Sequence, residues 1–341
     1  MAIATFQAIR ILATAIGSFV VALALTPAVT RLIKRFHLKK PIRSSESAPV
    51  FARLHKGKEG TPTAGGIIIW GTALILALIL MLMPLFNFID RAQTYLPIAA
   101  FFIAAIIGLI DDLLDILRMG PTGRGISVRQ KLVMYFAISL VGALWFYYRV
   151  GTDMLHIPFV GNVSMGLWYI PFFMFVVIAS AFSVNETDGL DGLAGGVMLF
   201  SFSALTVIAF ALARYHLATF NAVIAGALLA FLWFNIYPAR FFMGDTGSMA
   251  LGITLGVTAM LTNTALLLPF FAIIPIVETL SVLVQVTSKK LRGKKIFHST
   301  PIHHHFEAIG WPESQITMRF WIIAAVASIM GLVIFFLDRF L

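Results

Sequence analysis

Apolar residues in this chain come in long runs that are separated by short polar segments. A run of about 20 apolar residues is long enough to cross the ~30 Å hydrocarbon core of a bilayer as an α-helix. A short polar gap around Thr262 to Thr264 is all that separates the eighth run from the ninth. The pattern therefore predicts an all-α polytopic membrane protein, one integral membrane domain over residues 1–341 with about ten transmembrane helices. The predicted spans are 11–33, 64–83, 95–117, 130–149, 166–184, 193–213, 219–237, 247–262, 266–288 and 318–337.

Composition agrees with this class, because 60% of the residues are hydrophobic and only 12% are charged. The first apolar run follows Arg10 and is too long for the apolar region of a signal peptide, so we expect it to be retained as a helix. Cysteine is absent. Disulfides, thiolate nucleophiles and cysteine metal sites are therefore excluded.

The positions of lysine and arginine predict the orientation in the membrane. Of the 25 basic residues, 19 fall in alternate loops, beginning with Arg31 to Lys58 and ending with Lys289 to Lys295. By the positive-inside rule these loops face the cytoplasm, and both termini lie outside. The concentration of lysine and arginine in the cytoplasmic loops, and their attraction to anionic lipids, account for the net charge of +10. No nucleic-acid partner is therefore expected.

The acidic residues gather on the predicted cytoplasmic side, where this topology places eleven of the 15. An ion-coupled transporter more often carries ionisable residues near the middle of the membrane, at broken helices. The one candidate inside a span is Glu278, which follows Pro269 and Pro275, two residues expected to bend its helix. The one-sided distribution favours an enzyme over a transporter.

The segment from Asn185 to Gly196, NETDGLDGLAGG, sets three carboxylates and four glycines between two apolar runs. Ionisable groups are costly to keep at a membrane boundary, so they usually mark a site for ions, protons or charged substrates. This segment is therefore a candidate for chemistry.

Asp111 and Asp112 lie at the cytoplasmic end of the third predicted helix. Asp115 shares a helix face with Asp111, whereas Asp112 points about 100° away. Adjacent carboxylates repel each other unless a cation lies between them. A solvated helix end would also explain the pair, but a divalent ion or a phosphate–metal complex is the sharper hypothesis.

Asp245 stands between the seventh and eighth predicted helices, in FFMGDTGSMALG. Aspartate is a favoured N-cap residue, so one interpretation is that Asp245 caps the helix that follows. A second is that the helix start offers unpaired N–H groups to an anion while the carboxylate holds Mg²⁺. Both interpretations can hold together.

Two further segments suggest phosphate binding. Consecutive histidines such as His303, His304 and His305 cannot all face one way, so imidazoles that contact phosphate or a peptide carboxylate are expected rather than a three-histidine zinc site. The first cytoplasmic loop ends HKGKEGTPTAGG, which lacks the order of a P-loop. Its lysines and threonine hydroxyls beside a glycine-rich helix start would still suit a diphosphate.

Six segments, taken in order, resemble the phospho-N-acetylmuramoyl-pentapeptide transferases, members of the polyprenyl-phosphate hexosamine-1-phosphate transferase superfamily. They cover nearly the whole chain and read GTPTAGG, DD, NETDGLDGLAGG, WFNIYPARFFMGDTGS, ETLSVLVQ and PIHHHFEAIGWPE. The resemblance implies a ten-helix, Mg²⁺-dependent enzyme of the bacterial inner membrane, with its active site facing the cytoplasm. Such an enzyme joins UDP-MurNAc-pentapeptide to undecaprenyl phosphate, giving lipid I and UMP for peptidoglycan synthesis.

The resemblance also implies roles for individual residues. Asp245 would be the Mg²⁺ ligand, Asp111 and Asp112 the catalytic pair, and His304 a further catalytic residue, with His303 and His305 facing the substrate phosphate or sugar. The implied substrate-binding residues are Lys58, Thr61, Thr63, Asn185, Asp188, Asp191, Asn235, Phe242 and Gln285.

The lipid phosphate is expected to attack the sugar-linked phosphorus in line. A phosphate monoester with a second pKa near ~6 is already mostly ionised at neutral pH. Asp112 could therefore remove the remaining proton, position the phosphate, or attack first as a nucleophile. Our hypothesis is direct displacement. Glu186 departs from the family pattern, which usually has an apolar residue there, and we expect its side chain to face solvent.

Two alternatives accompany this hypothesis. A related transferase would use UDP-GlcNAc for another surface polymer, although relatives of that kind tend to space the histidines of the last loop differently from PIHHHFE. The second alternative is the ion-coupled transporter, which would release no UMP. Small-residue patterns such as Gly252 to Gly256 permit close helix contacts, either within the chain or between the copies of a homodimer.

Overall fold

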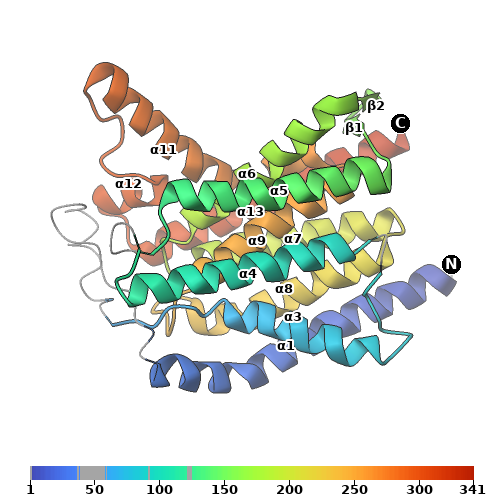
Figure 1. Cartoon of the computed structure of the whole chain (residues 1–341), viewed down its shortest axis with the longest axis horizontal. Coiled ribbons are helices and arrows are strands. Elements are labelled where there is room, and N and C mark those ends of the chain that lie inside the picture. The colour runs from blue at the N-terminus through green and yellow to red at the C-terminus, as the bar shows by residue number, and fades with distance from the viewer. Residues whose placement is uncertain (1, 37, 39–57, 59, 91–92, 121–124) are drawn as a thin grey trace.

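In a computed structural model of the chain, long helices run side by side and form one bundle (Figure 1). The structure describes residues 2–36, 38, 58, 60–90, 93–120 and 125–341. Its elements are α1 (Ala2–Arg35), α3 (Ile67–Met81), α4 (Tyr95–Ile116), α5 (Val128–Trp145), the π-helix η2 (Phe146–Val150), β1 (Met154–Ile157), β2 (Gly161–Ser164), the 3₁₀ helix η3 (Gly166–Trp168), α6 (Tyr169–Thr187), α7 (Leu193–Ala211), α8 (Tyr215–Asn235), α9 (Asp245–Leu261), η4 (Ala265–Leu267), α10 (Leu268–Phe271), α11 (Ile273–Arg292), α12 (Ile302–Ala308) and α13 (Glu313–Phe340).

Local sequence signals explain several helix ends. Ser127 and Gln130 form a capping box at the start of α5, in which the side chain of each residue bonds to the backbone N–H of the other. Gly293 follows α11 with a φ of 64°, the left-handed conformation that commonly ends a helix.

The predicted all-α membrane class is confirmed. Seven helices in the described part of the chain are long and apolar enough to span a membrane, or eight if the bent pair that ends in α11 counts as one span. All ten predicted spans fall on helices, but α3 and α9 have 15 and 17 residues, fewer than the ~20 of a full span. The number ten therefore stays a prediction.

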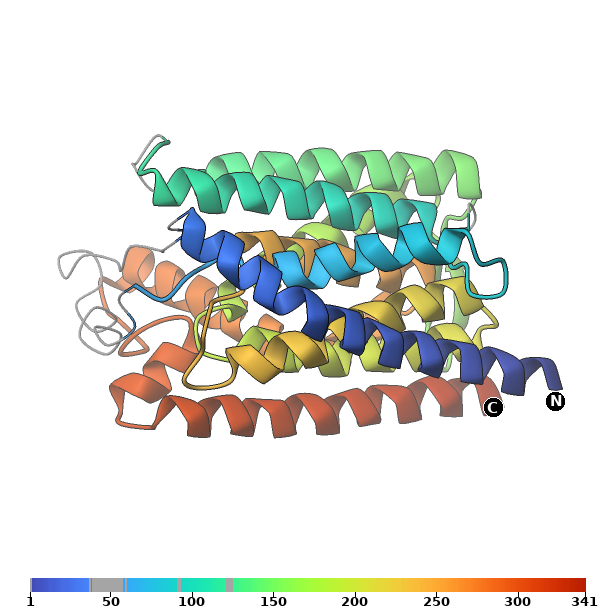
Figure 2. The ribbon, with the colours of Figure 1, turned by 90° about the horizontal axis from the view of Figure 1, so that it is seen from below.

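Both termini lie at one end of the bundle (Figures 1 and 2). At the opposite end lie the start of α9, which carries Asp245, and the short helix α12, which carries His303, His304 and His305 (Figure 1). The termini and those residues thus lie at opposite ends of the bundle. Which side faces the cytoplasm stays a prediction.

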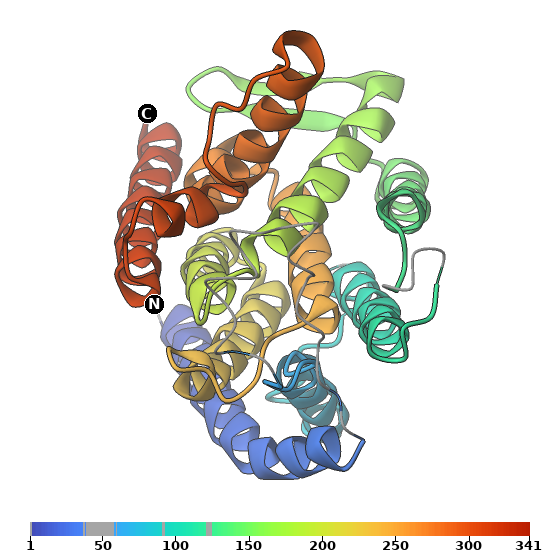
Figure 3. The same cartoon turned by 90° about the vertical axis from the view of Figure 1, so that its left-hand side faces the viewer.

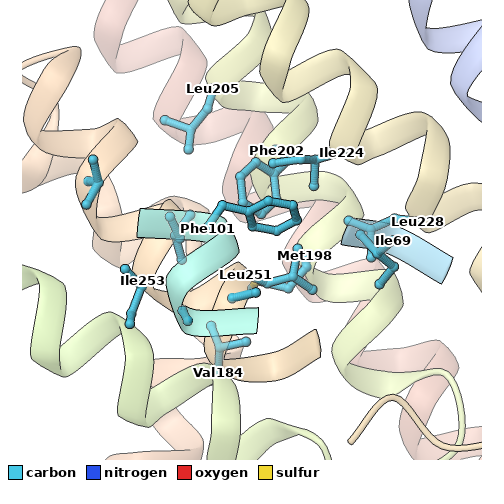
Figure 4. Close-up of a cluster of buried hydrophobic side chains, with 14 of the residues drawn as sticks. Ile69, Phe101, Val184, Met198, Phe202, Leu205, Ile224, Leu228, Leu251 and Ile253 are labelled. Carbon is cyan, nitrogen blue, oxygen red and sulfur yellow. The ribbon is translucent and has the colours of Figure 1, made fainter. Parts of the chain in front are cut away.

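The core of the bundle is α9, in which every residue from Thr246 to Leu261 is buried. It packs against α4 and α6, and the view from the site end shows it in the middle of the bundle (Figure 3). Large apolar side chains such as Phe101, Phe202 and Leu251 fill the space around it (Figure 4). This burial gives α9 a fixed position, so the residues at its first turn are held in place.

Small residues let α9 approach α6 closely. A Cβ added at Gly252 would lie 2.7 Å from Cα of Ala181, and one added at Gly256 would lie 2.8 Å from Cα of Val177. The pattern Gly252 to Gly256 is therefore used inside one chain, and it does not support a contact between subunits.

The ninth predicted span is broken. A 3₁₀ turn and α10 meet α11 at an angle of 89°, with the break at Ala272, so the bend expected after Pro269 is present. The helix α11 leaves the bundle at the site end (Figure 1). Its Glu278 is fully buried and contacts α12, as described below.

At the other end of the bundle, β1 and β2 pair as a short antiparallel hairpin, which the all-α prediction did not include.

Candidate active site

A lysine that was not among the predicted site residues joins two of the predicted acids. Lys131, in the first turn of α5, places its Nζ 2.6 Å from Oδ2 of Asp111 at the end of α4. The same ammonium also forms an ion pair and hydrogen bond with Oδ2 of Asp245 at the start of α9. The three side chains are 18%, 5% and 14% exposed. Because two largely buried carboxylates would otherwise repel each other, the shared cation stabilises their close approach.

Neighbouring groups fix the orientation of both carboxylates. The backbone N–H of Ile126 donates to Oδ1 of Asp111 at 2.5 Å. Asn185 donates from Nδ2 to Oδ1 of Asp245 at 3.0 Å and to the hydroxyl of Ser248 at 2.9 Å. The structure thus brings Asp111, Asn185 and Asp245 together, as the sequence predicts.

Asp112 has a different partner from Asp111. Its Oδ1 and Oδ2 accept hydrogen bonds of 3.1 Å from the backbone N–H groups of Asp245 and Thr246, and its side chain is buried. A carboxylate in this position satisfies two of the four N–H groups that a helix leaves unpaired at its start, and it interacts favourably with the helix dipole. Asp112 therefore caps α9 from a neighbouring helix.

This arrangement corrects two local expectations, that Asp245 caps α9 and that the start of this helix offers unpaired N–H groups. The N-cap residue of α9 is Gly244, and Asp245 is the first helical residue. The unpaired N–H groups expected at this helix start are also occupied, because the next two N–H groups, of Gly247 and Ser248, bond to the carbonyl of Gly244. The sequence could not show this, since the capping carboxylate is 133 residues away along the chain.

The segment from Asp188 to Gly192 connects the parts of the site. Oδ2 of Asp188 accepts a hydrogen bond from the N–H of Gly244 at 3.1 Å, next to the start of α9. Gly189 lies against His303, since an added Cβ would be 2.2 Å from Nε2 of that ring. At Gly192 the N–H donates to Oδ1 of Asn235 at 3.1 Å. This short segment touches α8, α9 and α12 together.

Asp191 anchors a second charged cluster. Its Oδ1 lies 2.6 Å from Nζ of Lys58, and its Oδ2 accepts a hydrogen bond from the N–H of Ala239 at 2.9 Å. Lys58 also pairs with Glu313 at the start of α13, and Glu313 accepts a 2.7 Å hydrogen bond from the N–H of Asp191. Glu313 was not among the predicted site residues.

The aromatic and amide residues predicted for the substrate pocket lie beside this cluster. Nζ of Lys58 is 5.8 Å from the ring centroid of Phe242. Asn235 donates from Nδ2 to the carbonyl of Phe241 at 2.8 Å, so its amide holds the backbone before Phe242 in place. Asn235 therefore positions the backbone beside Phe242, and its amide NH₂ is already engaged in this hydrogen bond.

The glycine-rich segment before α3 packs against the segment that contains Phe242 and Met243. The N–H groups of Gly65 and Gly66 donate to the carbonyls of Phe242 and Met243 at 2.8 Å. Those N–H groups are therefore engaged and do not cradle a diphosphate. Thr63 is buried, and among the described residues its hydroxyl has no hydrogen-bond partner. The N–H of Thr61 bonds to the carbonyl of Lys58 at 3.1 Å.

The three histidines on α12 face three different partners, as expected for consecutive residues. Nδ1 of His304 lies 2.6 Å from Oε2 of Glu307. Nδ1 of His305 accepts a hydrogen bond from the N–H of His298 at 3.2 Å. Burial and the neighbouring His298 hold the pKa of His305 below its ordinary value.

His303 is buried, with its Nδ1 3.0 Å from Oε2 of Glu278, although the atoms are not aligned as a hydrogen bond. Burial, the largest single effect, would lower the pKa of His303, but the neighbouring carboxylates, Glu278 first and then Glu307 and Glu186, together raise this pKa above its ordinary value.

Gln285 has a structural role in the loop that leads to these histidines. Its Oε1 accepts hydrogen bonds from the N–H groups of Ile296 and Phe297 at 2.9 and 3.1 Å. Its Nε2 donates to the carbonyl of Phe297 at 2.9 Å. Glu186 is half-buried, and its charge acts on His303 and on Tyr135 of α5. That its side chain faces solvent stays a prediction.

The donor atoms around Lys131 are suited to Mg²⁺, although no group of three or more histidine or acidic residues with metal-site geometry is found among the described residues. Mg²⁺ prefers carboxylate and other hard oxygen ligands and usually binds through one or two carboxylates. Asp111 and Asp245 provide two carboxylates around one positive charge. Their chemistry fits the metal that the sequence implies.

Comparison with known proteins identifies the family. Residues 94–263 match the family described as Glycosyl transferase family 4, which covers α4 through α9. A phospho-N-acetylmuramoyl-pentapeptide-transferase of Clostridium novyi (strain NT) is 40% identical over 317 residues, covering 92% of this chain and 93% of the relative. The chain belongs to the phospho-N-acetylmuramoyl-pentapeptide transferase family.

Other relatives agree over similar lengths. The protein of the same name from Clostridium perfringens (strain 13 / Type A) is 40% identical, covering 93% of this chain and 96% of the relative. That from Chloroflexus aurantiacus (strain ATCC 29366 / DSM 635 / J-10-fl) is 39% identical, covering 95% and 89%. Within this family of membrane transferases, Lys131 and Glu313 are the charged residues that reasoning from the sequence missed. Both look like ordinary basic or acidic residues at a helix start.

Proposed function

We propose that the protein transfers phospho-MurNAc-pentapeptide from UDP-MurNAc-pentapeptide to undecaprenyl phosphate, with Mg²⁺, giving lipid I and UMP. The observation that carries the proposal is the pairing of Asp111 and Asp245 around the single cation of Lys131. The proposal is supported by the relatives, whose names state this transferase activity.

Bringing a nucleotide diphosphate to a lipid phosphate requires positive charge, because the two polyanions repel. Phosphoryl transfer needs positioning and charge neutralisation more than covalent chemistry from the protein. Lys131 and Lys58 each lie between two carboxylates, so both ammonium groups are held at fixed points. When bound, Mg²⁺ would add positive charge at the phosphoryl oxygens, with Asp245 and Asp111 as its ligands.

The reaction is a direct displacement. An oxygen of the lipid phosphate forms a bond to the sugar-linked phosphorus, and the bond from that phosphorus to the bridging oxygen breaks. UMP leaves with the bonding electrons. Asp112 positions the start of α9 and thereby Asp245, since both of its oxygens bond to backbone N–H groups there. This role replaces that of a base or nucleophile for Asp112.

The remaining predicted residues take the substrate side of the site. Lys58, Phe242 and Asp191 lie together and would contact the nucleotide portion, with Asn235 shaping the backbone beside them. His304, which pairs with Glu307, would face the substrate phosphate or sugar. The protein would lie in the bacterial inner membrane, with this site open to the cytoplasm and both termini outside.

The test is UMP release by the purified protein in detergent or nanodiscs. UDP-MurNAc-pentapeptide should release UMP only when undecaprenyl phosphate is added, and UDP-GlcNAc should release none. Without the lipid acceptor, direct displacement predicts no burst of UMP and no labelled phospho-aspartyl protein. Turnover of UDP-GlcNAc instead would assign the chain to the related transferases. A stoichiometric burst would replace direct displacement with a covalent route.

A further inference from the structure

A cavity lies at the end of the bundle opposite the candidate active site. Its volume is about 360 Å³, within the range of about 300 to 1,000 Å³ that is usual for ligand pockets. It is bounded by the β1–β2 hairpin, the turn between α7 and α8, the turn between α9 and η4, and the last turns of α13. The hairpin and the C-terminus lie together at that end (Figure 1). None of the family segments lines this cavity.

Positive charge predominates in the lining. Arg214 and Arg339 line the cavity together with one acid, Asp338, and His156. The carboxylate of Asp338 is already engaged, because its Oδ2 lies 2.6 Å from Nε2 of His156 and its Oδ1 accepts a 2.5 Å hydrogen bond from the N–H of Phe159. The acid therefore ties the hairpin to α13, and the two guanidinium groups leave an excess of positive charge.

Arg214 is the more informative of the two arginines. It is half-buried between α7 and α8, and burial lowers its pKa. Its guanidinium has no ion pair or hydrogen bond with any residue that the structure describes. A positive charge that is partly removed from water without a partner is costly, and a bound anion would offset that cost.

The rest of the lining suits an anion carried on an apolar body. Oδ1 of Asn263 accepts a hydrogen bond from the N–H of His156 at 3.0 Å, which leaves the amide NH₂ of Asn263 as a donor. Apolar side chains complete the wall, namely Leu212, Leu266, Leu267 and Phe335. Arginine binds phosphate oxygens through paired N–H donors, and the end of a membrane-spanning bundle lies at the level of the phospholipid headgroups.

We propose that this cavity binds the phosphate group of an anionic phospholipid, with Arg214 and Arg339 as its cationic ligands. The apolar wall would take the first part of the lipid body. The site is separate from the transferase reaction, so it stands whether or not that function is correct.

Native mass spectrometry of the purified protein, titrated with phosphatidylglycerol or phosphatidylcholine, tests the proposal. The wild type should bind phosphatidylglycerol at least about tenfold more tightly than phosphatidylcholine, because both lipids carry a phosphate but the choline cation of phosphatidylcholine is repelled by the two arginines. Arg214→Gln and Arg339→Gln should each lose most of that preference, and Arg214→Lys should retain part of it.

Arg149→Gln is the matched control, because Arg149 is an exposed arginine in η2 and does not line the cavity. It should leave the preference unchanged. Equal losses in Arg149→Gln and Arg214→Gln would show general surface attraction and overturn the proposal. Displacement of the lipid by inorganic phosphate at millimolar concentration would assign the cavity to a free phosphate instead. Melting temperatures within about 2 °C of wild type would confirm that the variants are folded.

Discussion

The carboxylate of Asp112 accepts a 3.1 Å hydrogen bond from the backbone N–H of Asp245, the residue proposed to hold the metal. Its second oxygen accepts another from Thr246. The adjacent Asp111 instead contacts the ammonium of Lys131, which Asp245 also contacts. Two neighbouring acids on α4 thus act on Asp245 in different ways, one through the backbone and one through a shared cation.

Replacing Asp112 should therefore affect stability as well as activity. Asp112→Asn keeps one acceptor oxygen, so a buried N–H at the start of α9 loses its partner. The expected cost is about 1–3 kcal/mol in the free energy of unfolding, together with a large fall in turnover. Thermal or denaturant unfolding in detergent measures the first, and UMP release the second. Asp115→Asn, one turn from Asp111 on the same helix, should change neither. Inactivity of Asp112→Asn at full stability would favour a direct chemical role.

Lys131 should be coupled to Asp111 energetically. Lys131→Gln leaves two close carboxylates without their shared cation, so the unfolding midpoint should fall. Adding Asp111→Asn removes one of the negative charges, so the double variant should be more stable than the two single effects predict by at least about 0.5 kcal/mol. Strict additivity would contradict the contact. Arg129→Gln, an exposed residue two positions before Lys131, serves as the control.

The close contact of α7 with α13 makes Gly196 sensitive to substitution. A Cβ at this position would lie 2.0 Å from Nε1 of Trp321, whose Nε1 donates to the carbonyl of Gly192 at 3.1 Å. Gly196→Ala should lower both stability and activity, because the indole must move and the Asp188 to Gly192 segment with it.

Gly17→Ala on α1 provides a contrast, since no atom of the described residues lies within 4 Å of the added carbon. It should be neutral or stabilising by up to about 1 kcal/mol. Trp321→Leu in the Gly196→Ala background should recover part of the lost unfolding temperature. If the unfolding temperature does not recover, the contact with Trp321 is not the cause of the Gly196→Ala effect.

The pair of His303 and Glu278 should make stability depend on pH. The pKa of His303 is raised in the folded protein above its ordinary value of 6.5. The stabilisation from the charged pair is therefore fully present below about pH 6.5, and it is lost as the pH rises through the folded-state pKa. The difference in melting temperature between wild type and Glu278→Gln should be largest in mildly acidic buffer and should narrow in alkaline buffer. A difference that widens with pH would contradict the ion pair.

The sequence predicted the membrane class, the family and the gathering of acids at one end, because these depend on composition and on local motifs. It did not predict which side chains pair with the site residues. Asp245 looks like an N-cap residue from its neighbours alone, yet Asp112 supplies the cap from α4. Lys131 and Glu313 each follow a polar loop and look like charges at a helix start. Only the packing of α5 and α13 against the bundle brings these two residues to Asp111, Asp245 and Lys58.

Glycines were misread for a similar reason. The glycine-rich helix start of GTPTAGG was expected to suit a diphosphate, whereas the N–H groups of Gly65 and Gly66 pair with the carbonyls of Phe242 and Met243. The short length of α9 is also a tertiary effect, since a helix buried on all sides inside a bundle need not match the width of the bilayer.

The Mg²⁺ dependence of UMP release by wild type and Asp245→Asn tests the central claim most directly. With UDP-MurNAc-pentapeptide and undecaprenyl phosphate, the wild type should require Mg²⁺ and stop when EDTA is added. Asp245→Asn should reduce kcat by about 10²-fold or more, the scale expected when a group that stabilises developing charge is lost, while Asp115→Asn keeps the wild-type rate. A wild-type rate in Asp245→Asn, or release that continues in EDTA, would contradict the account.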